Sequence, residues 1–177
     1  MPLKLTVTPS SDFVALQSKI QSEQDAVAST AIIYASKHHK NTEKLVKAIA
    51  AAHDVALFDA EKDSIPSLDE YDCIGFASGI AYGKFYPSVS AAAEKYMTAG
   101  KKIFFLYTCG SHNRDMARVL KFLGEERGCK VLGSFGCPGF DTYGPFKLIG
   151  GISKNRPNEK DISEAVRFFE TEVSAEV

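Results

Sequence analysis

Residues 30–52, TAIIYASKHHKNTEKLVKAIAAA, combine an apolar run, a polar turn and an amphipathic helix. The run Thr30–Ala35 lacks polar alternation, which is typical of a strand buried on both faces of a parallel sheet. After the turn, Leu45, Ile49 and Ala52 recur at helical spacing. This stretch therefore predicts a strand, a loop at its carboxyl end and a helix that covers the sheet.

The same alternation continues along the rest of the chain. Apolar runs predict further strands at Val55–Phe58, Cys73–Ser78, Lys102–Thr108 and Lys130–Gly136. Helical spacing predicts a helix after Pro87, one around Met116–Leu123 and one from about Asn158 to Glu172, with Asn158 or Asp161 as its cap. We expect an α/β fold in which a doubly wound parallel sheet of five strands carries four or five helices on its two faces.

Composition limits the classes of function. The chain has 177 residues, 45% of them hydrophobic and 24% charged, which suits one compact domain. Its 21 basic and 22 acidic residues give a net charge of -1, so a nucleic-acid partner is not expected. The apolar runs are too short to span a membrane and the first residues lack the apolar core of a signal peptide, so we expect a soluble, cytoplasmic protein.

The cysteines do not indicate a metal site. Cys73, Cys109, Cys129 and Cys137 contain no C-x-x-C pair, so neither a zinc site nor an iron–sulfur cluster is signalled. We expect reduced, mostly buried thiols. Cys109 stands at the end of the fourth predicted strand, either as a redox thiol or, the preferred interpretation, as a buried bystander.

The first 29 residues do not follow the alternation of apolar strands and amphipathic helices that begins at residue 30. "LKLTVTP", residues 3–9, alternates like a half-exposed strand, and Phe13, Leu16 and Ile20 fall at helical spacing. We interpret residues 1–29 as an appended strand and helix, with a disordered leader as the alternative. The main domain is expected to cover residues 30–177.

The turn Ser36–Thr42 is a candidate phosphate site. Ligands of open parallel sheets bind beyond the carboxyl ends of the strands, where this turn lies. The amides of a helix start favour negative charge, Ser36 and Thr42 can add hydroxyl donors, and the basic side chains of the turn can add positive charge. The alternative is that Asn41 or Thr42 merely caps the helix. No P-loop and no G-x-G-x-x-G motif is present, so ATP, GTP and NAD lack their sequence signals.

Three loop sequences resemble those of the flavodoxin family. They are "SKHHKNT" at 36–42, "GFASGIAYGKFY" at 75–86 and "TCGSHNRD" at 108–115. The ending "GCPGFDTYGPFKLIGGISKNRPNEKD", residues 136–161, looks like that of a bacterial flavodoxin-like subgroup. The resemblance covers about residues 30–172 and implies a sheet of order 2-1-3-4-5 and FMN as the cofactor. Lys40 stands where the family usually has glycine.

The resemblance also implies which residues bind FMN. Its phosphate would be contacted by Ser36, His38, His39, Lys40, Asn41 and Thr42. The flavin ring would lie between two loops, against Ser78, Gly79, Ile80, Ala81, Tyr82, Gly83, Phe85, Thr108, Cys109, Gly110 and Asn113. These loops suit a flat ligand, because glycines allow close backbone approach and aromatic rings cover an apolar face. Tyr143 and Phe146 either border the flavin or fill the space beneath their loop.

The resemblance implies an electron-transfer protein that uses FMN and has no catalytic residue or metal of its own. Its partner would be a redox protein or a small-molecule acceptor, with no nucleic acid and no membrane. One alternative is an FMN-dependent NAD(P)H:quinone-type oxidoreductase. Another is a binding module that kept the fold and lost the flavin. The near-neutral charge differs from the acidic character of flavodoxins that carry electrons, and no nicotinamide-binding signal is present.

Overall fold

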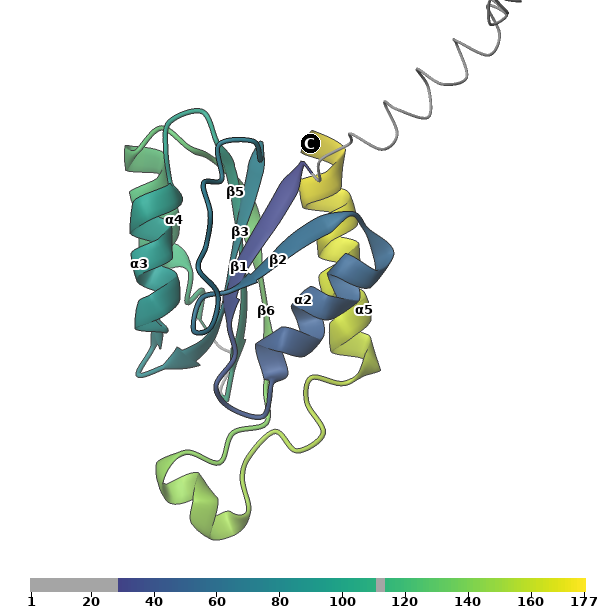
Figure 1. Cartoon of the computed structure of the whole chain (residues 1–177). Helices are drawn as coiled ribbons and strands as arrows, with labels where there is room; N and C mark the ends of the chain where they lie inside the picture. Colours follow the sequence, from purple (N-terminus) through teal and green to yellow (C-terminus); the bar gives the residue numbers. More distant parts are fainter. Residues whose placement is uncertain (1–28, 111–113) are drawn as a thin grey trace, which may run out of the picture.

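The computed structural model describes residues 29–110 and 114–177, which form an open parallel sheet covered on both faces (Figure 1). The parallel strands run in the spatial order β2-β1-β3-β5-β6. They are β1 Thr30–Ala35, β2 Val55–Asp59, β3 Cys73–Ala81, β5 Lys102–Cys109 and β6 Lys130–Pro138. This confirms the predicted fold and strand order, with β5 and β6 as the fourth and fifth predicted strands. The strand and helix expected before residue 29 lie outside the described residues.

Four α-helices cover the sheet in the described part of the chain. They are α2 Asn41–Ala52, α3 Pro87–Tyr96, α4 Arg118–Glu126 and α5 Glu159–Phe168. Figure 1 shows α3 and α4 on one face of the sheet and α2 and α5 on the other. The helix predicted to reach Glu172 ends at Phe168 and continues as a π-turn, Phe169–Val173, and a short 3-10 turn, Ser174–Glu176.

Aromatic packing on both faces of the central strands holds the layers together. The rings of Phe76 and Phe105 stack with centroids 5.9 Å apart on the α3 side. On the other face, the ring of Phe104 lies 5.8 Å from that of Phe169. A Cβ on Gly75 would come within 2.4 Å of the Phe104 ring, which explains a glycine in the middle of β3. At this point β3 and β5 pack together because the large ring of Phe104 faces a residue without a side chain, Gly75.

A short hairpin that was not predicted extends the end of β3. β4, Lys84–Phe85, pairs antiparallel with β3 through Ile80 and Ala81. The two turn residues Tyr82 and Gly83 have φ of 52° and 75°, the left-handed values that tight two-residue hairpin turns require. The hairpin carries Tyr82 to the carboxyl end of the sheet.

The start of α5 is fixed by both residues predicted as its cap. The Asn158 side chain accepts a hydrogen bond of 3.1 Å from the backbone N–H of Asp161, and Asp161 accepts one of 2.9 Å from the N–H of Asn158. This reciprocal pair is a capping box. Within residues 29–110 and 114–177, no helix has the length and apolar character needed to cross a bilayer.

Candidate functional site

A cavity of about 220 Å³ lies at the carboxyl ends of β1, β3, β5 and β6. Four loops meet around it: the turn before α2, the β3–β4 hairpin, the end of β5 and the segment after β6. Its walls are formed by Ser36, Lys37, His38, Asn41, Thr42, Gly79, Ile80, Ala81, Tyr82, Tyr86, Thr108, Cys109, Gly110, Gly139, Phe140, Asp141 and Tyr143. This is the position at which open parallel sheets bind ligands.

The turn before α2 is a left-handed bend built without glycine. His39 and Lys40 have φ of 52° and 54°. The hydroxyl of Ser36 accepts a hydrogen bond of 3.1 Å from the backbone N–H of Glu43 in the first turn of the helix. The backbone therefore makes the bend for which a glycine is usually used, and Ser36 satisfies one amide of the helix start.

Asn41 and Thr42 point into the protein instead of capping the helix. The Asn41 side-chain amide donates to the carbonyl of Phe140 at 2.8 Å, and the hydroxyls of Thr42 and Thr108 lie 2.9 Å apart. The Asn41 side-chain oxygen is buried and has no hydrogen-bond partner among the described residues. A buried acceptor of this kind is costly unless a ligand or water supplies a donor. The interpretation of these two residues as simple helix caps is therefore not supported.

Replacement of Lys40 by glycine is expected to stabilise the protein. A left-handed conformation costs a residue with a Cβ about 1–2 kcal/mol, and the flexibility of glycine in the unfolded chain offsets roughly half of this. We expect Lys40→Gly to raise the free energy of unfolding by about 0.5 kcal/mol. Lys44→Gly, at an exposed position inside α2, is expected to lower it by about 1 kcal/mol. Urea unfolding followed by circular dichroism measures the free energy of unfolding of both variants. An equal loss of stability in Lys40→Gly and Lys44→Gly would contradict the strained turn.

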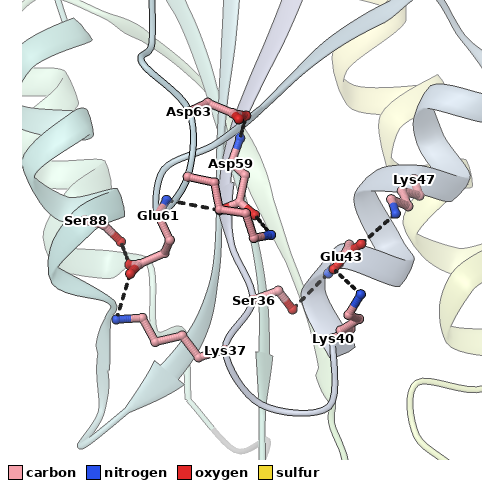
Figure 2. Close-up of polar contacts among 10 residues, drawn as sticks. Ser36, Lys37, Lys40, Glu43, Lys47, Asp59, Glu61, Asp63 and Ser88 are labelled. Carbon is pink, nitrogen blue, oxygen red and sulfur yellow. Dashed lines mark hydrogen bonds and ion pairs between the residues drawn. The ribbon is translucent and has the colours of Figure 1, made fainter.

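Two ion-pair networks position the lysines near the turn (Figure 2). The Lys37 ammonium lies 3.1 Å from Glu61 and 5.4 Å from the centroid of the Tyr86 ring. Glu61 also accepts a hydrogen bond from Ser88, and this bond, with that from Lys37, lowers the pKa of Glu61 against the opposing effect of burial. The side chain of Lys37 is thus held between α3 and the cavity.

The second network turns Lys40 away from the cavity. Its ammonium lies 3.8 Å from Glu43, which also pairs with Lys47 at 2.6 Å (Figure 2). The hydrogen bond from Lys47 is the main reason why the pKa of Glu43 is lowered. The Glu43 carboxylate beside the turn is therefore paired with two lysines, Lys40 and Lys47.

Two tyrosines meet over the cavity. Tyr82 of the hairpin and Tyr143 of the segment after β6 contact each other through their hydroxyls, with ring centroids 5.7 Å apart and ring planes at 84°. The hydrogen bond with Tyr82 raises the pKa of Tyr143. Of the two aromatics left undecided by the sequence, Tyr143 borders the cavity, whereas Phe146 is not among its lining residues.

The structure brings most of the sequence-predicted residues to this cavity. Those that line it are Ser36, His38, Asn41, Thr42, Gly79, Ile80, Ala81, Tyr82, Thr108, Cys109 and Gly110. Those that do not are His39, Lys40, Ser78, Gly83 and Phe85, and Asn113 lies outside the described residues.

Two of the residues outside the lining have structural contacts that explain their position. The His39 ring packs on Phe140 at 4.3 Å, and its Nε2 lies 3.0 Å from the hydroxyl of Thr142. Ser78 is buried, donates to the carbonyl of Gly79 and accepts from the N–H of Tyr86, which fixes the hairpin. Both residues therefore support the loops around the cavity.

Sequence reasoning did not place part of the wall. The lining residues not assigned to the site were Lys37, Gly139, Phe140 and Asp141. Tyr143 had been left undecided, and Tyr86 ends the loop sequence at 75–86 that was expected to face the ring. The signal for Gly139, Phe140 and Asp141 was their position directly after the last strand, on the ligand side of the sheet. Gly139 is needed there, because a Cβ would come within 2.8 Å of the Asn41 side-chain amide.

Cys109 has the properties of a structural thiol. It lines the cavity but is only 6% exposed, and burial raises its pKa to about 11. The thiol is therefore protonated at neutral pH, and a protonated thiol is a poor nucleophile. This favours the interpretation of Cys109 as a bystander. None of the four cysteines, all within the described residues, forms a disulfide.

Solved structures with the same architecture include flavodoxins. An archaeal flavodoxin superposes with a TM-score of 0.55 at 16% identity, over 78% of this chain and 92% of that protein. Megasphaera elsdenii flavodoxin gives a TM-score of 0.54 at 19% identity, over 77% and 97%. Rubredoxin oxygen:oxidoreductase from Desulfovibrio gigas gives 0.62 at 12% identity over 93% of this chain, which spans only 40% of that larger protein.

The sheet order, the helices and the cavity define a protein of the flavodoxin-like fold. No protein-family model matches the sequence. An uncharacterized protein of Methanocaldococcus jannaschii, MJ0298, is 40% identical over 143 residues, which cover 77% of this chain and 93% of that protein. The chain belongs to the same family as this archaeal protein.

Proposed function

We propose that the protein binds FMN in this cavity and transfers electrons to and from a partner protein. The observation that carries the proposal is the turn before α2, where Ser36, Asn41 and Thr42 line a cavity that continues between two aromatic loops. A polar pocket at a helix start joined to a flat, aromatic slot matches a ligand with a phosphate at one end and a planar ring at the other.

The residues present fit a phosphate monoester at the α2 end. Three residues that carry hydroxyls, Ser36, Thr42 and Thr108, line the cavity, and the helix dipole favours an anion there. The unpartnered oxygen of Asn41 suits a hydroxyl of a sugar-like chain, because a phosphate dianion has no proton to donate. Asp141 also borders the cavity, and its carboxylate would repel a phosphate placed beside it.

The other end of the cavity fits a planar ring. Gly79 and Gly110 line this end and pack closely on Tyr86 and Asp141, where an added Cβ would come within 2.7 Å of either side chain. Tyr82 and Tyr143, with ring planes at 84°, border the same end. FMN, when bound, supplies the electron-transfer chemistry, and the protein sets its environment and access.

Heating the purified protein is expected to release FMN instead of FAD or riboflavin. The cavity has one helix start for one phosphate, and no dinucleotide fingerprint is present in the sequence. Chromatography of the supernatant identifies the released flavin. FAD as the main species would contradict the assignment of the α2 turn to a terminal phosphate, and a colourless protein that binds no added FMN would favour a module without flavin.

An electron carrier is favoured over a reductase because no nicotinamide-binding signal accompanies the cavity. We expect NADPH or NADH alone to reduce the FMN-loaded protein slowly, and a separate flavoprotein reductase to reduce it quickly. Anaerobic stopped-flow absorbance measures both rates under identical conditions. Fast, saturable reduction by NADPH with turnover of a quinone would assign the protein to the reductases instead.

A further inference from the structure

Large hydrophobic side chains are exposed on the β3–β4 hairpin and on the segment after β6, two of the loops that border the cavity. Tyr82, Tyr143, Phe146, Leu148 and Ile149 are 84%, 54%, 37%, 91% and 66% exposed. They are five of the eight large hydrophobics exposed among residues 29–110 and 114–177. We refer to these five residues as the apolar rim. Apolar groups concentrated at one place on a surface mark an interaction site.

Most of the apolar rim lies on one projecting segment. η1, Gly144–Ile149, is a 3-10 turn in the loop between β6 and α5, and Figure 1 shows this loop extending beyond the end of the sheet. A bridge between Asp141 and Ile152 and the hydrogen bond from Gly151 N–H to the Phe146 carbonyl, 2.7 Å long, tie the base of the loop together. The exposed residues therefore sit on an ordered support and not on a free end.

Cations without an acidic partner flank the apolar rim. Lys84 follows the hairpin turn, Lys147 lies inside η1, and the Lys154 ammonium lies beside Gly150, where an added Cβ would be 3.3 Å from its Nζ. All three are exposed, and within the described residues none is in an ion pair. Asp141 is the acidic residue on this segment. The mouth is thus locally basic although the whole chain has a net charge of -1.

We propose that the apolar rim, with Lys84, Lys147 and Lys154, is the docking surface for an acidic redox protein. This inference rests on the proposed function, since it places the partner where electrons would enter or leave. Interfaces of this type combine an apolar, tyrosine-rich centre with a charged border that steers the partner. Three unpaired lysines are fewer than the four to eight basic residues that typically hold a protein on an anionic membrane, so a protein surface fits better.

A small acidic [2Fe–2S] ferredoxin is the probe for the test, and binding is measured by NMR titration of the FMN-loaded and the FMN-free protein. The double variant Lys147→Glu/Lys154→Glu is expected to weaken ferredoxin binding about tenfold at low salt. Leu148→Ser/Ile149→Ser is expected to weaken it by a similar factor that persists at high salt. The matched control is Lys95→Glu/Lys130→Glu, which changes the net charge equally. Its sites are near the end of α3 and at the start of β6, at the opposite end of the sheet.

Four outcomes would overturn the proposal. They are equal losses in the rim and control variants, a preference for basic cytochrome c over ferredoxin, ferredoxin-independent binding to phosphatidylserine vesicles, and self-association abolished by Leu148→Ser/Ile149→Ser. FMN titration of every variant is run separately. If the unaltered protein binds ferredoxin but does not bind FMN, only the proposed function is contradicted. If it binds FMN but does not bind ferredoxin, only the inference about the docking surface is contradicted.

Discussion

Thr42→Ala is expected to weaken FMN binding about ten- to a hundredfold and to leave riboflavin binding nearly unchanged. Thr42 is fully buried and lines the cavity at the start of α2, and its hydroxyl lies 2.9 Å from the hydroxyl of Thr108. A hydrogen bond to a charged group contributes about 1.5–3 kcal/mol, which corresponds to this range of affinity. Riboflavin lacks the phosphate and does not make the contact. Fluorescence titration of the FMN-free protein measures both affinities.

The conservative variant Thr42→Ser separates binding from folding in this experiment. Serine keeps the hydroxyl and loses only the methyl group, so FMN affinity is expected to stay within a few-fold of the original. A parallel measurement of unfolding identifies any loss of stability caused by the truncated core contact. Equal weakening of FMN and riboflavin in Thr42→Ala would show that the turn serves only to start the helix.

Asp161→Asn is expected to lower the free energy of unfolding by about 2–3 kcal/mol at pH 7. The substitution leaves the half-buried guanidinium of Arg156 without its counterpart. The Asp161 side chain is 2% exposed and accepts a hydrogen bond from the backbone N–H of Asn158. Its two carboxylate oxygens also form a bidentate pair with the Arg156 guanidinium. Glu159→Gln, at an exposed position in the same helical turn, is the matched control with an expected change below about 0.5 kcal/mol.

The pH dependence gives this prediction a second measurement. Burial by itself would raise the pKa of Asp161, but the hydrogen bonds from Arg156 and Asn158 outweigh it and lower the pKa below its usual range. A carboxyl with a lowered folded-state pKa stabilises the fold above the unfolded-state pKa of about 3.9, and this contribution is lost as the pH falls through the folded-state value. Unfolding curves of the native protein and of Asp161→Asn should therefore converge in acid. A constant difference down to pH 2 would contradict the ion pair.

Local patterns were sufficient to predict the architecture. The apolar runs at Thr30–Ala35 and Lys102–Thr108 have no polar alternation, and this is a direct consequence of burial on both faces of the sheet. Asn158 and Asp161 were likewise readable as a helix start, because a cap and its reciprocal acceptor are three residues apart in the chain. Each of these features depends on neighbours in sequence, which is why the sequence alone contained it.

The predicted position of the ligand site came from the same local information. A turn between a buried strand and a helix must lie at the carboxyl edge of the sheet, so the Ser36–Thr42 turn was expected beside the loops after β3 and β5. Cys109 and Thr108 reach the cavity for the same reason, as the last residues of their strand. The exact set of lining residues was less accessible, because a position in the turn does not determine whether a side chain enters the cavity, as Asn41 does, or turns outward to an ion pair, as Lys40 does.

Long-range pairing decided the rest. The contacts between Tyr82 and Tyr143 and between Asn41 and Phe140 join residues that are 61 and 99 positions apart, and no local pattern encodes them. The β4 hairpin has only two residues, too few to produce a period, and the exposed hydrophobics of η1 resemble core residues when read as sequence. The sequence by itself determined the strands, the helices and the edge of the sheet where the cavity lies. Only the tertiary structure decided which side chains close the cavity and which apolar groups remain outside, since both depend on loops brought together by the sheet.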